Sequence, residues 1–152
     1  MLAAGDRVPP FETTDESGRP VRSGDLHGRP CVLFFYPKAG SWGCTCEAVG
    51  FANRYPEFAA RGIVVLGISL DPAEAQRSFS ARCQLPYPLL VDPSGNIARA
   101  FGVLGTFGFA RRVTFLVGAD GRVLRVVDSV LPGTHVRAAL DLLEGPSPGK
   151  VA

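Results

Sequence analysis

Two short apolar runs, separated by a segment of helical periodicity, constrain the fold of this chain more than any other feature. The runs are Cys31–Tyr36 and Ile63–Ser69, and their length and composition are those of strands buried on both faces. Between them, apolar residues recur at intervals of three and four from Cys44 onward, which predicts a helix with one buried face, and Gly62 suits its end. This order predicts two parallel strands joined by a helical crossover.

The rest of the chain continues the alternation of strands and helices. The expected elements are a hairpin over Phe11–Val21, a helix from Asp71 to Cys83, a strand Leu89–Val91, a short helix Ile97–Phe101, a hairpin of Val113–Val117 with Val123–Val127, and a last helix His135–Leu143. The fold class predicted is α/β, a mixed central β-sheet flanked by helices with an N-terminal β-hairpin. The thioredoxin fold fits this order.

Three local features of the expected helices can be checked. Pro56 removes an amide hydrogen bond from the first helix, so we expect a kink there or two successive helices. Asp71 is expected to cap the second helix, with Pro72 at its first position, and Thr134 is expected to cap the last one.

Length and composition indicate one domain. With 152 residues, of which 46% are hydrophobic, we expect a single domain over 1–145 and a flexible C-terminal tail over 146–152, where proline and glycine are frequent.

Charge and hydropathy exclude several classes of protein. The formal net charge is +2 and the arginines are scattered, which does not favour a nucleic-acid partner. The longest apolar runs fall far short of the roughly 20 residues that a membrane helix needs. The first ten residues lack the pattern of a secretory signal, so we expect a soluble, cytoplasmic protein. Four cysteines in such a chain favour catalysis or redox sensing over structural disulfides.

One segment carries most of the chemistry. It places Pro37, Ser41 and Cys44 in the pattern Pro-x-x-x-(Thr/Ser)-x-x-Cys, with the cysteine at the start of a helix. The pattern resembles the active-site loop of peroxiredoxins. Further motifs of that family are Asp-Leu-x-Gly at 25–28, Gly-Ile-Ser at 67–69, Pro-Leu-Leu-x-Asp at 88–92, Phe-Gly-Val at 101–103 and Arg-x-Thr-Phe-Leu at 112–116.

Within that family the chain is most similar to the peroxiredoxin Q, or bacterioferritin-comigratory, type. The loop of that type usually reads Thr-Pro-Gly-Cys-Thr, whereas residues 41–45 here read Ser-Trp-Gly-Cys-Thr. The resemblance implies a thiol peroxidase that reduces hydrogen peroxide and small organic (alkyl) hydroperoxides.

The resemblance also implies a role for each site residue. Cys44 would attack the peroxide, and a helix N-terminus favours the thiolate that this needs. Arg112 matches the family's arginine, with Arg111 as a substitute, and would stabilise charge along the breaking O–O bond. Ser41 would orient the peroxide and Pro37 would shield the sulfur from water. Cys44 could instead be a buried structural cysteine. Its loop and its position at a helix start favour an accessible thiolate.

A second thiol usually condenses with the sulfenic acid that the attack leaves on the first cysteine. In peroxiredoxin Q relatives the resolving cysteine occupies a place that here is Val49 or Ser80, and Cys83 lies one helical turn beyond the latter. We therefore expect Cys83 to resolve, with local unwinding around Cys44 or Cys83. Cys46 is the rival, although a small packed side chain is the expected reading there, and an external thiol is the third possibility. Cys31 is expected to be inert core.

No cofactor or metal is predicted, because the chain lacks a phosphate-binding glycine loop and its cysteines and histidines are not paired for zinc. Both His27 and His135 are expected at the surface. Electrons would come from thioredoxin or another thiol reductant, and relatives of this type suggest a monomer. The alternatives are a thioredoxin-like thiol-disulfide protein, a peroxide sensor that uses the same Cys44 without multiple turnover, and a zinc-binding module.

Overall fold

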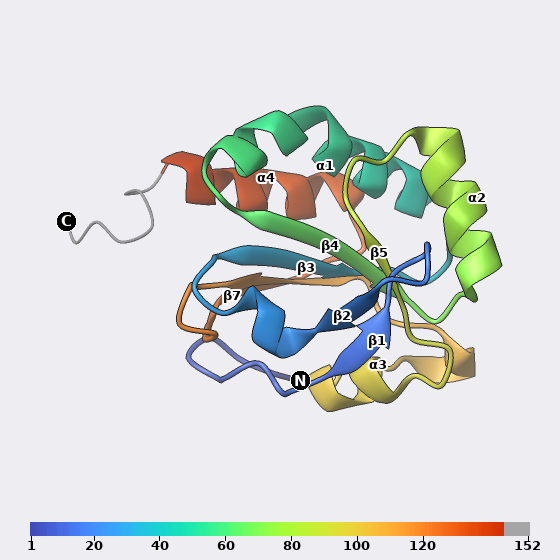
Figure 1. Ribbon diagram of the computed structural model, residues 1–152, viewed down its shortest axis with the longest axis horizontal. Coiled ribbons are helices and arrows are strands. Elements are labelled where there is room, and N and C mark those ends of the chain that lie inside the picture. Colours follow the sequence, from blue (N-terminus) through green and yellow to red (C-terminus); the bar gives the residue numbers. More distant parts are fainter. Residues whose placement is uncertain (145–152) are drawn as a thin grey trace.

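In the computed structural model, which describes residues 1–144 and their side chains as far as Leu142, a five-stranded mixed β-sheet runs through the molecule (Figure 1). Its strands are β3 (Cys31–Phe35), β4 (Val64–Ser69), β5 (Leu89–Val91), β6 (Val113–Val117) and β7 (Val123–Asp128). The order across the sheet is β5-β4-β3-β6-β7. Strands β3, β4 and β5 are parallel to one another, β6 is antiparallel to its neighbour β3, and β7 is antiparallel to β6. The predicted mixed sheet is confirmed.

Helices cover both faces of this sheet. The helices are α1 (Trp42–Ala60), α2 (Ala73–Cys83), α3 (Asn96–Phe101) and α4 (Pro132–Glu144), with short 3-10 helices at Ser23–Leu26 and Thr106–Gly108. Helices α1, α2 and α4 lie on one face, and α3 lies on the other together with the hairpin of β1 (Glu12–Thr14) and β2 (Pro20–Arg22), as Figure 1 shows. The arrangement is that of the thioredoxin fold.

The central strand β3 separates two hydrophobic cores. Because side chains alternate along a strand, Leu33 and Phe35 enter the core beneath α3, whereas Phe34 and Tyr36 enter the core beneath α1. All four side chains are fully buried. A strand that is buried on both faces must be apolar at every position, which explains the uninterrupted apolar run in the sequence.

Of the two alternatives expected at Pro56, a kink or two successive helices, the structure excludes the second. Helix α1 is continuous from Trp42 to Ala60 with Pro56 inside it, so the alternative of two successive helices is wrong. Tertiary packing accounts for this, because Phe51 before the proline and Phe58 after it are both buried in the same core.

Two helix caps were predicted in the wrong place. Pro72 is the N-cap of α2, and the Asp71 carboxylate instead accepts hydrogen bonds from the Ser69 hydroxyl at 2.7 Å and from the Ala39 amide at 2.8 Å. Helix α4 begins at Pro132, so Thr134 lies inside its first turn. Proline is favoured in a first turn, where its missing amide would have no partner.

None of the helices between residues 1 and 144 is both long and apolar enough to cross a membrane. The predicted C-terminal tail, 146–152, lies outside the described residues.

Candidate active site

The loop between β3 and α1 brings Cys44 to the end of the central strand. The loop runs from Pro37 to Ser41, and α1 starts at Trp42, so Cys44 occupies the first turn as predicted. The Asp71 carboxylate, which follows the neighbouring strand β4, holds the loop through the Ala39 amide. Because β3 and β4 are adjacent and parallel, the segments that follow them, with Cys44 and Asp71, lie at the same end of the sheet.

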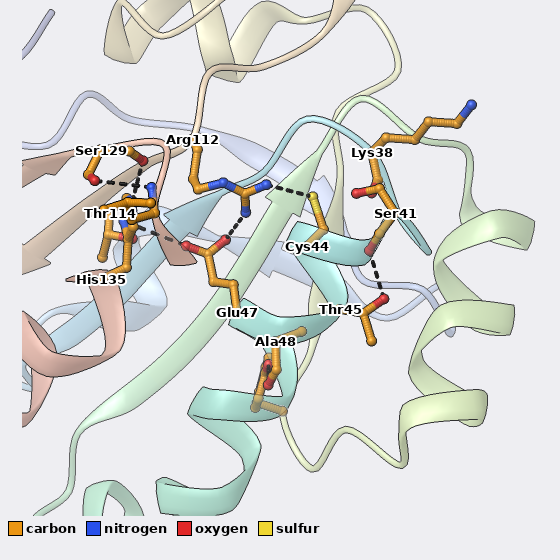
Figure 2. A network of polar contacts seen from close by, with 12 residues as sticks. Lys38, Ser41, Cys44, Thr45, Glu47, Ala48, Arg112, Thr114, Ser129 and His135 are labelled. Carbon is orange, nitrogen blue, oxygen red and sulfur yellow. Dashed lines mark hydrogen bonds and ion pairs between the residues drawn. The ribbon is translucent and has the colours of Figure 1, made fainter. Parts of the chain in front are cut away.

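The Cys44 sulfur faces inward toward an arginine. Arg112, the residue before β6, donates a hydrogen bond from Nη2 to Cys44 Sγ at 3.4 Å (Figure 2). The cysteine is 1% exposed and belongs to the core beneath α1. The expectation of an accessible thiol is therefore wrong for this structure. Cys44 is buried because it precedes the buried Ala48 by one helical turn and lies on the same face of α1.

The other arm of the same guanidinium binds a buried carboxylate. Arg112 Nη1 donates to Glu47 Oε1 at 2.9 Å, and the two side chains are 11% and 0% exposed. Burial raises the pKa of Glu47 to about 7, against the attraction of Arg112, which lowers it. Arg112 is thus fixed between Glu47 and Cys44, as Figure 2 shows.

Comparison with known proteins assigns the chain to a family. Residues 4–126 match the model of the AhpC/TSA family. The chain belongs to the AhpC/TSA family. Over 150 residues it is 34% identical to Peroxiredoxin Bcp of Escherichia coli (strain K12), a match that covers 94% of this chain and 96% of that protein.

Solved structures agree with this assignment. The crystal structure of Peroxidoxin BcpB from Mycobacterium tuberculosis has a TM-score of 0.88 at 39% identity, covering 95% of this chain and 97% of that one. The bacterioferritin comigratory protein of Xanthomonas campestris, whose alkyl peroxide reduction activity has been studied in trapped intermediate and ligand complexes, has a TM-score of 0.82 at 29% identity, covering 88% and 90%. The protein is a peroxiredoxin of the bacterioferritin-comigratory type and hence a thiol peroxidase.

Of the two candidate arginines in this peroxiredoxin, the structure brings only Arg112 to the sulfur. Arg111 instead forms a half-exposed ion pair with Asp128 at 2.7 Å. Neighbouring residues of an extended chain point to opposite sides, which explains why one arginine enters the site and the next faces solvent.

The predicted site residues Ser41 and Pro37 lie in the loop of the peroxiredoxin. The Ser41 hydroxyl donates to the Lys38 carbonyl at 2.9 Å, and its own carbonyl accepts from the Thr45 hydroxyl at 2.8 Å. The hydroxyl is therefore engaged within the loop. Pro37 is half-buried, and Trp42, which stands where the type usually has proline, is 82% exposed.

The four thiols of this peroxiredoxin are all free and lie in different surroundings. Cys83, at the end of α2, is half-buried and packs against the same core as Cys44. Cys46 is exposed, so the expectation that it is packed is wrong. Cys31 is buried in the opposite core, as predicted, and desolvation raises its pKa to about 12.

Two buried polar residues of the site, Glu47 and His135, were not predicted from the sequence. Glu47 was not singled out, although it lies one turn before Phe51 on the buried face of α1. His135, expected at the surface, is fully buried, whereas His27 is exposed as expected. The signal for His135 was its position one turn before Ala139, which is fully buried. In residues 1–144, no three His, Cys, Asp or Glu side chains are grouped so that they could hold a metal ion.

Proposed function

We propose that Cys44 is the attacking thiol of this peroxidase and that it reduces hydrogen peroxide and small alkyl hydroperoxides. The hydrogen bond from Arg112 Nη2 to Cys44 Sγ, 3.4 Å long, carries this assignment. A guanidinium remains charged at every physiological pH, so it favours a thiolate over a thiol. The N-terminus of α1, a helix of 19 residues, acts in the same direction through its dipole.

The attack is a displacement at oxygen. The Cys44 thiolate forms an S–O bond to one peroxide oxygen while the O–O bond breaks, and the other oxygen leaves with the electron pair and takes up a proton. The products are a Cys44 sulfenic acid and water or an alcohol. Negative charge moves from sulfur to the leaving oxygen, and Arg112, which contacts the sulfur, is placed to stabilise it throughout.

Two loop residues complete the proposed site. The Ser41 hydroxyl, which donates to Lys38 in the resting loop, would turn to hydrogen-bond the bound peroxide. Pro37 would shield the sulfur, because its ring has no amide hydrogen to bring water to it. The burial of Cys44, which is 1% exposed, favours small peroxides and disfavours direct attack by a bulky thiol.

Cys83 is the proposed resolving residue. Its thiol would attack the Cys44 sulfenic sulfur, releasing water and forming a Cys44–Cys83 disulfide. Support comes from their shared core, since Cys83 packs against the cluster that contains Cys44, while Cys31 lies across the sheet. Both cysteines are held in helices, and disulfide geometry requires their Cα atoms to come within about 7 Å, so local unwinding is expected.

Thioredoxin or another thiol reductant would return the disulfide to two thiols, becoming oxidised itself. A reducing, cytoplasmic location would suit this cycle. The monomeric state and the single domain over 1–145 stay predictions, and analytical ultracentrifugation with limited proteolysis tests them.

The experiment is to add one equivalent of hydrogen peroxide to the reduced protein, block free thiols by alkylation and map each cysteine by peptide mass spectrometry. We expect a Cys44–Cys83 linkage in the wild type and sulfenic or sulfinic acid on Cys44 in the Cys83→Ser variant. Cys46→Ser is the matched control, because Cys46 lies two residues from Cys44 but is exposed, and it should behave as the wild type.

Other outcomes would reassign the roles. A Cys44–Cys46 linkage would make Cys46 the resolving residue, and a stable Cys44 sulfenic acid in the wild type would point to an external thiol. A Cys44 that remains a thiol while peroxide persists would refute the assignment. Repeated turnover with excess dithiothreitol separates an enzyme from a sensor that reacts once.

A further inference from the structure

Beyond the contact of Arg112 with Cys44, a chain of buried polar groups continues to a histidine on α4. His135 is fully buried, and its Nε2 lies 2.7 Å from the Ser129 carbonyl oxygen (Figure 2). A carbonyl oxygen only accepts hydrogen bonds, so Nε2 carries a proton. The neutral ring therefore presents a lone pair at Nδ1, which lies 2.8 Å from the Thr114 hydroxyl on β6.

The same Nδ1 faces the carboxylate that binds Arg112. Glu47 Oε2 lies 3.5 Å from His135 Nδ1. In the described part of the chain, this oxygen is the only buried side-chain nitrogen or oxygen without a hydrogen bond. An ionised, unbonded carboxylate oxygen opposite a lone pair is costly in a buried site. A single proton between Oε2 and Nδ1 removes that conflict.

The charged and ionisable groups near this pair lie on three sides. Arg112 contacts Glu47 from the start of β6, Cys44 lies on the far side of the guanidinium, and Asp128 approaches from the end of β7 with its partner Arg111. Burial raises the pKa of Glu47 to about 7 and lowers that of His135, which the Ser129 carbonyl opposes. Burial thus disfavours the charged form of both groups, so the pair is least costly when it carries one proton in all.

We propose that His135 is a positioning residue of the peroxidase: it holds Glu47, and through Glu47 the Arg112 guanidinium, and it shares one proton with the Glu47 carboxylate. This inference rests on the proposed function, since it requires Cys44 to be the attacking thiol. With that proton, Arg112, Glu47 and His135 together carry one positive charge. Without it their charges sum to zero, and the attraction for the thiolate and the leaving oxygen is weaker.

The wild-type protein tests the shared proton directly. The chain has two histidines, so a nuclear magnetic resonance titration of the imidazole rings contains one reporter and one internal reference, the exposed His27. We expect the His135 ring signals to change at the same pH as the alkaline fall in the rate constant for hydrogen peroxide. A His135 ring whose signals stay unchanged over the pH range in which the rate constant falls would overturn the proposal.

Two variants test the positioning. His135→Asn keeps a polar group near the place of Nδ1, which faces Glu47, whereas His135→Gln keeps one near the place of Nε2, which faces Ser129. We expect the Gln variant to lose roughly tenfold to a hundredfold in the peroxide rate constant, because the guanidinium is misplaced, and the Asn variant to recover most of that loss. His27→Gln is the control and should match the wild type.

The outcomes separate this inference from the proposed function. If both variants keep the wild-type rate constant and pH profile, or both lose activity equally, His135 supports only the fold and the inference is wrong. If the wild type itself does not oxidise Cys44 with peroxide, the proposed function fails first. The titration of the wild-type rings needs no variant, so it decides the matter even where a substituted chain does not fold.

Discussion

Arg112 donates hydrogen bonds to two groups at once, which requires a side chain with two donor arms. Its guanidinium bonds Glu47 through Nη1 and Cys44 through Nη2. A lysine has a single ammonium on a flexible stem and cannot reproduce a planar fork. We expect Arg112→Lys to lower the rate constant for hydrogen peroxide by about a hundredfold, the cost of one lost oxyanion donor. Stopped-flow kinetics with the reduced protein measures it.

The neighbouring arginine provides the control for this substitution. Arg111 pairs with Asp128 in an ion pair whose side chains are 47% and 39% exposed. Such pairs contribute little, so Arg111→Lys should keep the rate constant within about twofold. Equal losses in the two variants would mean that the loss at Arg112 does not come from its contact with Cys44.

Glu47 makes the stability of the fold depend on pH. Its pKa rises from the ordinary 4.5 to about 7, chiefly through burial, so between these values the folded chain holds a proton that the unfolded chain has released. This carboxyl therefore lowers the free energy of unfolding as the pH rises. His135 acts in the opposite sense below 6.5, because its lowered pKa leaves the proton on the unfolded chain.

The variant Glu47→Gln removes the pH dependence that comes from Glu47 and keeps the one that comes from His135. Relative to the wild type, its free energy of unfolding should rise between pH 5 and pH 7, by at most about 1.4 kcal/mol per pH unit. Urea denaturation at several pH values measures the difference. Curves that stay parallel over this range would show that Glu47 is ionised in the folded protein throughout.

At the residue scale, family motifs in the sequence single out Cys44 and Arg112, and the structure brings these two side chains into contact. The sequence was not enough for the groups behind them. Helical periodicity places His135 and Ala139 on one face, but it does not say that this face meets Glu47 of another helix. A polar residue at the border of an apolar stripe is equally compatible with the surface, so only the packing of α4 against α1 decides.

Among the elements, β4 shows how closely the helices and strands of this fold are packed. An added Cβ at Gly67 would lie 2.8 Å from Leu89 Cδ2, 2.9 Å from Phe34 Cζ and 3.1 Å from Tyr36 Cε1. Aromatic rings in a filled core cannot retreat without moving others. We expect Gly67→Ala to lower the free energy of unfolding by about 1–3 kcal/mol, as overpacking does. Equilibrium urea unfolding measures this.

Gly133 is the matched control for that substitution. It lies in the first turn of α4, and an added Cβ there meets no atom within 4 Å. Alanine is the better helix former, so Gly133→Ala should leave the stability unchanged or raise it by up to about 1 kcal/mol. Destabilisation of similar size in both variants would contradict the packing argument at Gly67.

The elements themselves were largely predictable, and their ends were not. The strands of the sheet appear in the sequence as apolar runs, since burial on both faces leaves no room for polar residues. Helix starts depend on which group satisfies the first amides. Asp71 is a residue type that often caps helices, but its carboxylate accepts a hydrogen bond from the Ala39 amide of the active-site loop instead. A contact between distant segments thus overrode the local signal.

For the molecule as a whole, the sheet divides the cysteines between two cores. Cys44 and Cys83 belong to the face of α1 and α2, Cys31 belongs to the opposite face, and Cys46 points to solvent. The division would protect the proposed cycle, because a thiol on the far side of a five-stranded sheet cannot intercept a sulfenic acid on Cys44. It also turns Cys31 into a reporter of global unfolding.

Cys31 lies in the central strand, is 1% exposed and has a pKa raised to about 12 by burial. Alkylating reagents react with the thiolate, so iodoacetamide should label Cys31 only from the unfolded state, while the exposed Cys46 is labelled at once. A variant that lowers the free energy of unfolding by 1.4 kcal/mol should then be labelled about tenfold faster at Cys31. Gly67→Ala should show this acceleration at Cys31 and none at Cys46. If the Cys31 rate does not follow stability, β3 must open locally while the rest of the sheet stays folded.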